Sequence, residues 1–112
     1  MEIDDCVFCN IAARKVPANI YFEDQDLLVV PDIFPKAPVH MLIISREHIP
    51  SISSITEQHQ ALLGKMIFKA KQVAEEQGVS ATGYKLAFNV GKQGGQIVPH
   101  LHLHLLGGKD MA

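Results

Sequence analysis

The sequence predicts an α+β fold, in which an antiparallel sheet of about five strands packs with one long helix and one short N-terminal helix. Residues 57–77 carry apolar side chains at the i, i+3 and i+4 spacing of an amphipathic helix. Five short runs outside this stretch are apolar or rich in β-branched residues and are bounded by turn-forming residues, as strands are. The order of three strands, a helix and two strands, with short connections, favours antiparallel pairing with the helices to one side. A chain of 112 residues has room for one domain, residues 1–112.

The N-terminal part of the chain predicts a short helix and a hairpin. Residues 6–14 have helical apolar spacing, and a helix there must end before Pro17. Residues 19–23 and 27–32 are two β-rich runs, separated by the polar turn of residues 24–26. We therefore expect these two runs to pair as a hairpin.

A central strand is predicted after a proline-rich loop. Pro35 and Pro38 enforce the loop, because proline is a strong punctuator of regular structure. Residues 39–44 then form a nearly continuous apolar run, which is typical of a strand that is buried on both faces. Its one polar residue is His40.

The long helix has recognisable boundaries. Ser54 or Thr56 can cap its start, and Gly78 stops it. We expect Phe68 to serve packing and His59, near the polar start, to be solvated. The apolar positions that define the packing face are Leu62, Leu63, Met66, Ile67, Ala70, Val73 and Ala74.

Residues 84–90 alternate in the manner of a strand with two different faces. One face carries Leu86 and Phe88, and the other carries Ala87 and Asn89. A glycine-rich loop, residues 91–96, connects this strand to the last one.

The last strand contains three histidines, His100, His102 and His104, with leucines between and after them. Because successive strand side chains point to opposite faces, the histidines share one face and Leu101, Leu103 and Leu105 share the other. At about 3.3 Å per residue, the Cα atoms of the outer two histidines lie roughly 13 Å apart. Zinc holds its ligand nitrogens at ~2.0–2.1 Å, so the three rings cannot all converge on one ion and should divide their work. An exposed polar face and a structural metal strand remain alternatives.

Cys6 and Cys9 form a C-x-x-C pair at the start of the first helix. A redox pair is a poor match, because no βαβ pattern precedes it. Two ordinary buried cysteines remain an alternative, since free cysteine is readily buried. The favoured hypothesis is half of a Cys2His2 zinc site that two histidines complete.

Two polar features have structural as well as functional interpretations. The loop of residues 91–96 lacks the Gly-Lys-Ser/Thr of a phosphate-binding Walker loop and is, by itself, typical of a hairpin connection. Before a histidine strand, however, bare backbone N–H groups at Gly94, Gly95 and Gln96 can approach phosphate oxygens. Asp32, at a strand end, is on its own typical of a turn-capping carboxylate.

The composition restricts partners and location. A net charge of −2, with 10 Lys and Arg against 12 Asp and Glu, argues against a nucleic-acid polymer as partner. Residues 1–5 are acidic and lack the apolar core of a secretory signal, and no run approaches the ~20 apolar residues needed to cross a bilayer. We expect a cytoplasmic protein with reduced cysteines, no membrane attachment and a partner subunit, because so short a chain buries a limited fraction of its surface.

The segment from His100 to Leu106 alternates histidine with apolar residues and resembles the motif of the histidine-triad (HIT) nucleotide-binding family. Gly94-Gly95-Gln96 before it and Gly107-Gly108 after it resemble the Hint branch of that family. The resemblance spans nearly the whole chain, and it implies a HIT-like fold and a homodimer.

The resemblance also implies two sites. One is a structural Zn²⁺ ion bound by Cys6, Cys9, His48 and His100. The other is a purine mononucleotide site for AMP or GMP, in which Asp32 accepts the ribose hydroxyls and Ile33, with Phe8 and Ile11, walls the base. The nucleotide-binding residues that it implies are Asp32, Ile33, Asn89, Gly95, Gln96, Ile97, His102 and His104.

The implied activity is hydrolysis of purine nucleoside phosphoramidates of the AMP-NH2 type, with no metal required for the chemistry. His102, a neutral imidazole with an ordinary pKa of ~6.5, attacks the α-phosphorus and forms a nucleotidyl-histidine. Its Nδ1 should donate to a backbone carbonyl, so that Nε2 stays unprotonated. His104 stabilises charge on the phosphoryl group. His40 orients a partner or shuttles a proton, unless it is a satisfied core histidine.

Two other functions remain open at this stage. One is a dinucleoside polyphosphate hydrolase of the same family, although that branch lacks the closing Gly107-Gly108. The other is a nucleotide-responsive binding protein with vestigial activity. Ile97 departs from the small hydroxyl residue that Hint proteins often have near the leaving group, and this bears on leaving-group preference and turnover rather than on nucleotide binding.

Overall fold

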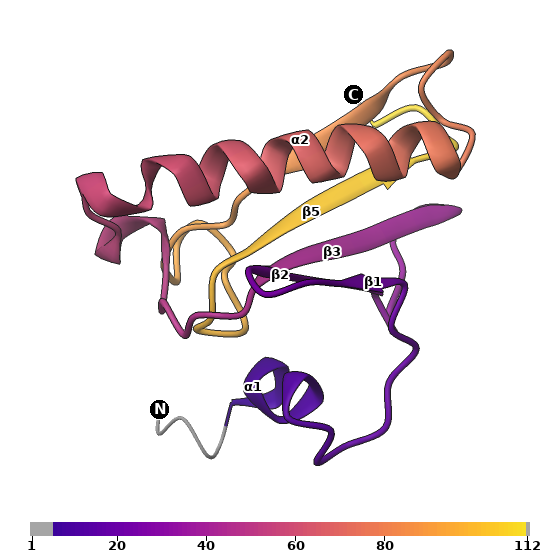
Figure 1. Ribbon diagram of the computed structural model, residues 1–112. Helices are drawn as coiled ribbons and strands as arrows, with labels where there is room; N and C mark the ends of the chain where they lie inside the picture. Colours follow the sequence, from indigo (N-terminus) through magenta and orange to yellow (C-terminus); the bar gives the residue numbers. More distant parts are fainter. Residues whose placement is uncertain (1–5, 112) are drawn as a thin grey trace.

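The computed structural model describes residues 6–111 and contains a five-stranded antiparallel sheet (Figure 1). The strands are β1 (Phe22–Glu23), β2 (Leu27–Pro31), β3 (Val39–Ser45), β4 (Tyr84–Ala87) and β5 (His102–Gly107). They lie in the order β1-β2-β3-β5-β4, which confirms the predicted fold class, the hairpin and the central position of β3. The prediction that no secretory signal is present falls on residues 1–5, outside the described residues. No helix among the described residues is long and apolar enough to cross a membrane.

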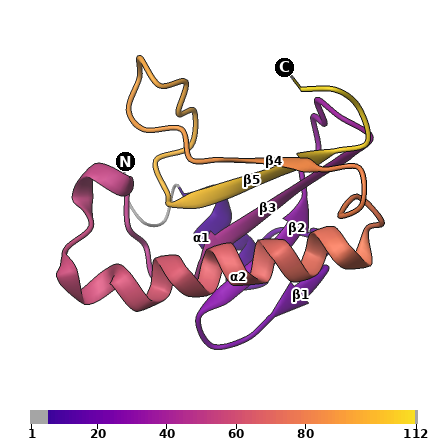
Figure 2. The same cartoon turned by 90° about the horizontal axis from the view of Figure 1, so that it is seen from above.

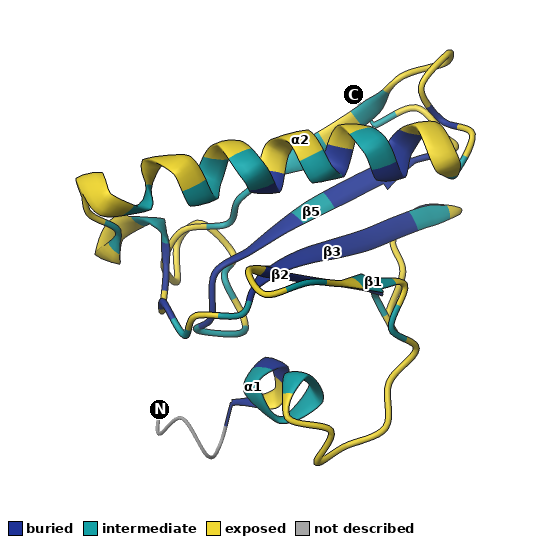
Figure 3. Cartoon of the chain, viewed as in Figure 1, coloured by how far each residue is buried: buried dark blue, intermediate teal, exposed yellow. Residues whose placement is uncertain are grey.

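The two helices cover opposite faces of the sheet, and the prediction that they lie to one side is wrong. α2 (Gln60–Glu76) packs on β3 and β5 from one face, and α1 (Val7–Ala12) lies against the other (Figures 1 and 2). The reason is the composition of the central strands, which present apolar side chains to both faces. Figure 3 shows the result: most of β3 and β5 is buried beneath the inner side of α2.

Strand alternation divides the core into two clusters. The α2 face contains, among others, Leu27, Val29, Met41, Ile43, Leu101, Leu103 and Leu105. The α1 face contains Cys6, Phe8, Leu28, Val30, Leu42 and Ile44. In the register of β3 with β5, Leu42 pairs with His104 and Ile44 with His102, so these two histidines belong to the α1 face. The predicted separation of histidines from leucines is confirmed.

Several strand boundaries differ from the predictions. β1 begins at Phe22 rather than Asn19, and β4 ends at Ala87 rather than Val90. β5 begins only at His102, so His100 precedes the strand. The chain turns there, because the N–H of His100 bonds to the Val98 carbonyl (2.8 Å) and the intervening proline has no N–H to pair with a neighbouring strand.

Thr56, one of the two residues predicted to cap the long helix, caps its start. A short 3-10 turn, η3 (Glu57–His59), precedes α2, and the Thr56 hydroxyl accepts from the N–H of Gln58 (3.3 Å). In return the Thr56 N–H donates to Nδ1 of His59 (3.0 Å). His59 therefore completes a cap and is not merely solvated. Gly78, with φ +76°, ends the helix as predicted.

Two apolar side chains of α2 do not reach the core. Phe68 is 58% exposed and Ile67 is 48% exposed, whereas Met66 is fully buried. At 100° per residue, Phe68 lies about 200° around the helix from Met66. The predictions that Phe68 serves packing and that Ile67 belongs to the packing face are therefore wrong within the described part of the chain.

Candidate active site

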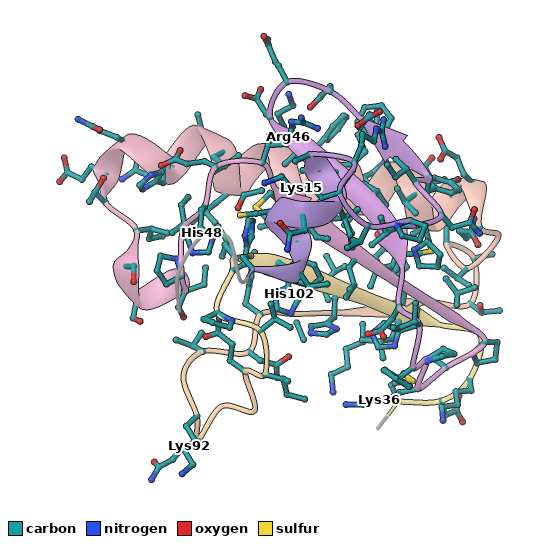
Figure 4. All side chains as sticks on the ribbon, turned by 90° about the horizontal axis from the view of Figure 1, so that it is seen from below. Lys15, Lys36, Arg46, His48, Lys92 and His102 are labelled. Carbon is teal, nitrogen blue, oxygen red and sulfur yellow. The ribbon has the colours of Figure 1, made fainter. Side chains whose placement is uncertain are left out.

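A cavity of about 500 Å³ opens on the α1 face of the sheet. Its apolar lining includes Phe8 and Ile11 of α1 together with Ile33, the three residues predicted to wall a base. Its polar lining includes His102 and His104 of β5. Of the predicted nucleotide-binding residues, all except Gln96 line this cavity. Figure 4 shows His102 beside α1, with the loop that carries Lys92 on one side and the loop that carries Lys36 on the other.

His102 presents an unprotonated nitrogen to this cavity. Its Nδ1 lies 2.6 Å from the carbonyl oxygen of His100, and because a carbonyl only accepts, Nδ1 must carry the proton and donate. The predicted donation is confirmed, and it leaves a lone pair on Nε2. Burial lowers the pKa of His102 against the opposing effect of this hydrogen bond, so the ring is neutral at pH 7. Phe8 packs edge-on against the ring, with 5.1 Å between centroids, and restricts its orientation.

A chain of hydrogen bonds that starts at the backbone determines the proton positions of His40 and His104. The N–H of Lys36 donates to Nδ1 of His40 (3.1 Å), so the proton of neutral His40 sits on Nε2. That Nε2 lies 2.9 Å from Nδ1 of His104 and donates to it. The proton of neutral His104 therefore sits on its Nε2, the remaining nitrogen of a ring that lines the cavity. Burial lowers the pKa of both side chains, that of His104 to about 4, with His102 and His40 adding to the latter shift.

His40 is thus a buried histidine with both ring nitrogens engaged, as the structural alternative required, and it also orients His104. It is 4% exposed and does not line the cavity. No sequence signal pointed to the main chain of Lys36, because the tautomer of His40 depends on how the proline-rich loop folds back.

Asp32 serves as a turn cap and faces the cavity as well. Its Oδ1 accepts from the N–H of Phe34 (2.9 Å), which is the structural role expected of an Asp at a strand end. Its Oδ2 lies 3.3 Å from Nε2 of His40, and the side chain lines the cavity. A carboxylate offers about four acceptor sites, so capacity for a ligand remains.

The glycine-rich loop does not offer the free N–H groups that the sequence predicted. The donors of Gly94 and Gln96 both bond to the carbonyl of Gly91 (3.1 and 3.0 Å), and the donor of Gly95 bonds to the carbonyl of Lys92 (3.1 Å). The prediction is wrong in this respect, because so short a loop satisfies its own donors by folding into consecutive tight turns.

Two other donors remain on this side of the cavity. The amide of Asn89 donates one hydrogen to the carbonyl of Gly94 (2.9 Å) and retains a second. The backbone N–H of Ile97 has no acceptor among the described residues. Asn89 and Ile97 both line the cavity, so a ligand phosphate there would meet an amide and a main-chain N–H.

A second cluster, formed by Cys6, Cys9, His48 and His100, brings four ligand atoms to within 4.8 Å of one another. The shortest separations are 3.1 Å for the Cys6 Sγ–His100 Nδ1 pair, 3.2 Å for the Cys9 Sγ–His48 Nδ1 pair and 3.1 Å for the two Nδ1 atoms. Nε2 of His100 donates to the carbonyl of Ser45 (2.6 Å), which leaves its Nδ1 as an unprotonated ligand atom.

This donor set fits zinc. Tetrahedral zinc with sulfur at ~2.3 Å and nitrogen at ~2.0 Å separates its ligands by about 3.3–3.8 Å, close to the separations above. Two Nδ1 atoms that face each other need a proton or a cation between them. Burial, and then the neighbouring Cys6, raise the pKa of Cys9 to about 11, so the ligand thiolate needs a cation to stabilise it.

Known proteins resemble this chain over nearly its full length. The family described as "Scavenger mRNA decapping enzyme C-term binding" matches residues 5–111. Protein HitA of Neisseria gonorrhoeae is 43% identical over 105 residues, which cover 94% of this chain and 97% of that protein. The purine nucleoside phosphoramidase of Escherichia coli (strain K12) is 38% identical over 108 residues, which cover 96% of this chain and 91% of that enzyme.

Solved structures show the same architecture. A HIT family hydrolase from Clostridium thermocellum has a TM-score of 0.95 and 45% identity, with 99% of this chain and 96% of that chain covered. A HIT family hydrolase from Legionella pneumophila has a TM-score of 0.94 and 45% identity, with 96% of each chain covered.

Proposed function

Because this chain belongs to the histidine-triad (HIT) family of hydrolases, we propose that it hydrolyses purine nucleoside phosphoramidates through a covalent nucleotidyl-histidine. The observation that carries the proposal is the unprotonated Nε2 of His102, which results from donation by Nδ1 to a main-chain carbonyl. The Escherichia coli relative, named a purine nucleoside phosphoramidase, supports the substrate class.

In the first step the lone pair of His102 Nε2 forms a bond to the α-phosphorus while the P–N bond to the amine breaks. The amine nitrogen takes a proton from water and departs, since a protonated nitrogen leaves readily. In the second step water bonds to the phosphorus and its proton passes to solvent. The bond to His102 then breaks, which releases the mononucleotide and restores the neutral ring.

His104 stabilises charge in both steps as a hydrogen-bond donor. Its Nε2–H can donate to a phosphoryl oxygen, where negative charge develops. His104 does not relay protons from His40. Nδ1 of His40 accepts a hydrogen bond from the main chain, so neutral His40 has no second ring proton to supply. His40 is therefore a positioning residue, and no metal takes part in this chemistry.

The nucleoside lies between α1 and the strand ends. Ile33, with Phe8 and Ile11, provides an apolar wall for a purine such as adenine or guanine. Asp32 accepts the ribose hydroxyls with the acceptor sites that its turn does not use. Asn89 and the N–H of Ile97 bind the phosphate, beside the wall that Gly95 forms.

The cysteine–histidine cluster holds structural Zn²⁺ in this proposal. The residues that would bind it are Cys6, Cys9, His48 and His100, which join α1 to the start of β5. Free thiol ligands of this kind persist in a reducing compartment, so we place the protein in the cytoplasm. The domain acts as a homodimer that meets its mate along β4.

Replacing His102 by Ala tests the activity. We expect turnover of adenosine 5′-monophosphoramidate to fall by about 10⁴-fold or more, as when other nucleophiles are removed, while AMP binding is largely retained. His59→Ala, which removes a histidine outside the cavity, serves as the control and should keep full turnover.

The same assay separates the alternatives. Faster turnover of diadenosine polyphosphate than of the amidate would assign the chain to the other hydrolase branch. Tight AMP binding with negligible turnover of every amidate would make it a nucleotide-responsive binding protein. Retained hydrolysis in His102→Ala would reject the covalent role.

A further inference from the structure

The side chain of Gln96 is fully engaged with the protein. Its Oε1 accepts from the N–H of Gly91 (3.0 Å). Its Nε2 donates to the carbonyl of Pro50 (2.7 Å) and to the carbonyl of Val98 (3.0 Å). An amide nitrogen carries two hydrogens, so none remains for a phosphate oxygen. Gln96 also does not line the cavity, although both of its chain neighbours do.

The segment around Pro50, to which Gln96 donates, is itself held by the core. Pro50 belongs to the connection after β3, and the residue before it, Ile49, is 4% exposed within the core. The carbonyl of Ile49 accepts from the N–H of Leu101 (2.6 Å), just before β5 begins. The connection is therefore a fixed support beside the strand that carries His102.

The glycine-rich loop has little else to hold it in place. The backbone N–H groups of Gly94, Gly95 and Gln96 bond to carbonyls within the loop, and the side-chain amide of Asn89, just before the loop, donates to the Gly94 carbonyl. Among the described residues, the bond from Gln96 to the Pro50 carbonyl is the only hydrogen bond that ties residues 91–96 to a segment distant in sequence. Gly91 and Gly95, with φ +70° and +83°, add conformational freedom at the two ends of the loop. Without the Gln96 contacts the loop can move as a unit away from the cavity wall.

We infer that Gln96 is a positioning residue, which fastens the glycine-rich loop to the connection after β3 and so holds Gly95 and the N–H of Ile97 at the cavity wall for a nucleotide phosphate. The inference rests on the proposed nucleotide site. It replaces the predicted role of Gln96 as a phosphate ligand with an indirect one. The chemical class of the ligand remains a purine mononucleotide.

Gln96→Met tests this role, because methionine has a similar length, carries no charge and makes none of the three hydrogen bonds. Gln93→Met is the matched control, since Gln93 is an exposed glutamine of the same loop with no partner among the described residues. Gln96→Asn, which keeps an amide on a shorter side chain, provides a second variant should the methionine variant fold poorly.

Two measurements are made on each full-length variant. Amide hydrogen exchange of the ligand-free protein reports whether residues 91–98 are held in place. Calorimetric titration with AMP gives the dissociation constant, and steady-state assays give kcat and KM. We expect Gln96→Met to exchange faster in this segment, to bind AMP about tenfold more weakly and to change kcat by less than KM, whereas Gln93→Met should match the wild type.

The outcomes distinguish positioning from direct binding. Weaker AMP binding with unchanged loop exchange would make Gln96 a ligand and would overturn the inference, as would wild-type exchange and affinity. A wild type without phosphoramidase activity would reject the proposed reaction but would leave the test of Gln96 intact. Amide hydrogen exchange is measured without ligand, and AMP binding is measured without turnover.

Discussion

His40, His102 and His104 owe their proton positions to main-chain groups. The carbonyl of His100 accepts a hydrogen bond from Nδ1 of His102, and the N–H of Lys36 donates a hydrogen bond to Nδ1 of His40. An imidazole in the other tautomer would leave one of these partners unsatisfied, at a cost of about 1–3 kcal/mol for a buried group. The proton positions of His102, the proposed nucleophile, and of His104, the proposed charge-stabilising donor, are therefore set before any substrate arrives.

The half-buried position of His104 predicts a pH dependence of stability. Burial, with smaller contributions from His102 and His40, lowers its pKa to about 4, against an ordinary value of ~6.5 when unfolded. Asp32 opposes this shift and Lys36 adds to it slightly. Between these two pH values the unfolded chain binds more protons than the folded one, so the free energy of unfolding falls as the pH falls from 6.5 towards 4.

Urea unfolding at pH values between 4.5 and 7.5 measures this effect. His104→Asn removes the titrating ring and should show a smaller loss of stability over the same range. An equal loss in the variant and the wild type would contradict the prediction.

Single residues also show what a sequence can and cannot indicate about such a site. Strand alternation placed His102 and His104 in the cavity, and the C-x-x-C spacing found the cysteine half of the second cluster. The role of Gln96 and the engaged N–H groups of the glycines escaped prediction, because loop hydrogen bonds depend on distant segments such as Pro50.

Among the elements, α1 depends most on its contacts. A helix of six residues is too short to be stable by itself. Phe8 packs on the rings of His100 and His102, and Cys6 and Cys9 meet two histidines from other segments. Since α1 forms part of the apolar wall of the cavity, it links the cysteine–histidine cluster mechanically to the proposed nucleotide site.

Metal analysis of the purified protein tests this link. We expect about one zinc ion per wild-type chain and little or none in Cys9→Ser, because a Cys2His2 site loses one of four ligands. The variant should also bind AMP more weakly, since α1 loses an attachment. Absence of zinc from the wild type, or equal zinc in both proteins, would end the zinc proposal.

Predictions of helices and strands succeeded where the hydrophobic pattern extended over many residues, and they failed at the ends of the strands. The apolar run at β3 was correctly assigned to a central strand buried on both faces. That same run requires cover on both faces, which is why the helices lie on opposite sides of the sheet. Ends of strands moved by several residues, because pairing partners rather than local composition decide where a ladder stops.

At the scale of the whole molecule, the β4 edge of the sheet and one flank of α2 lack partners among residues 6–111. β4 is an edge strand, and no strand in the described part of the chain pairs with its outer side. On α2, Lys65 pairs with acidic residues of the β1–β2 turn and Lys69 lies over Phe22, so that flank faces β1. Ile67 lies on the opposite flank, towards β4, and is 48% exposed. A second copy of the chain would cover this region.

Sedimentation of the purified protein tests the homodimer. We expect a dimer for the wild type and a folded monomer for Ile67→Glu, because a buried charge at an apolar contact is costly. Ala61→Glu places the same charge at an exposed position of the same helix and should leave the dimer intact. A monomeric wild type, or an unchanged dimer in Ile67→Glu, would contradict the proposal.

The covalent nucleotidyl-histidine is tested most directly by trapping it. The wild-type protein is mixed with excess adenosine 5′-monophosphoramidate, quenched in alkali to preserve a histidine–phosphorus bond, digested and analysed by mass spectrometry. We expect one adenylyl group on the peptide that contains His102, and localised to that residue. An adduct on another side chain, or steady hydrolysis with no adduct at any time point, would contradict the mechanism.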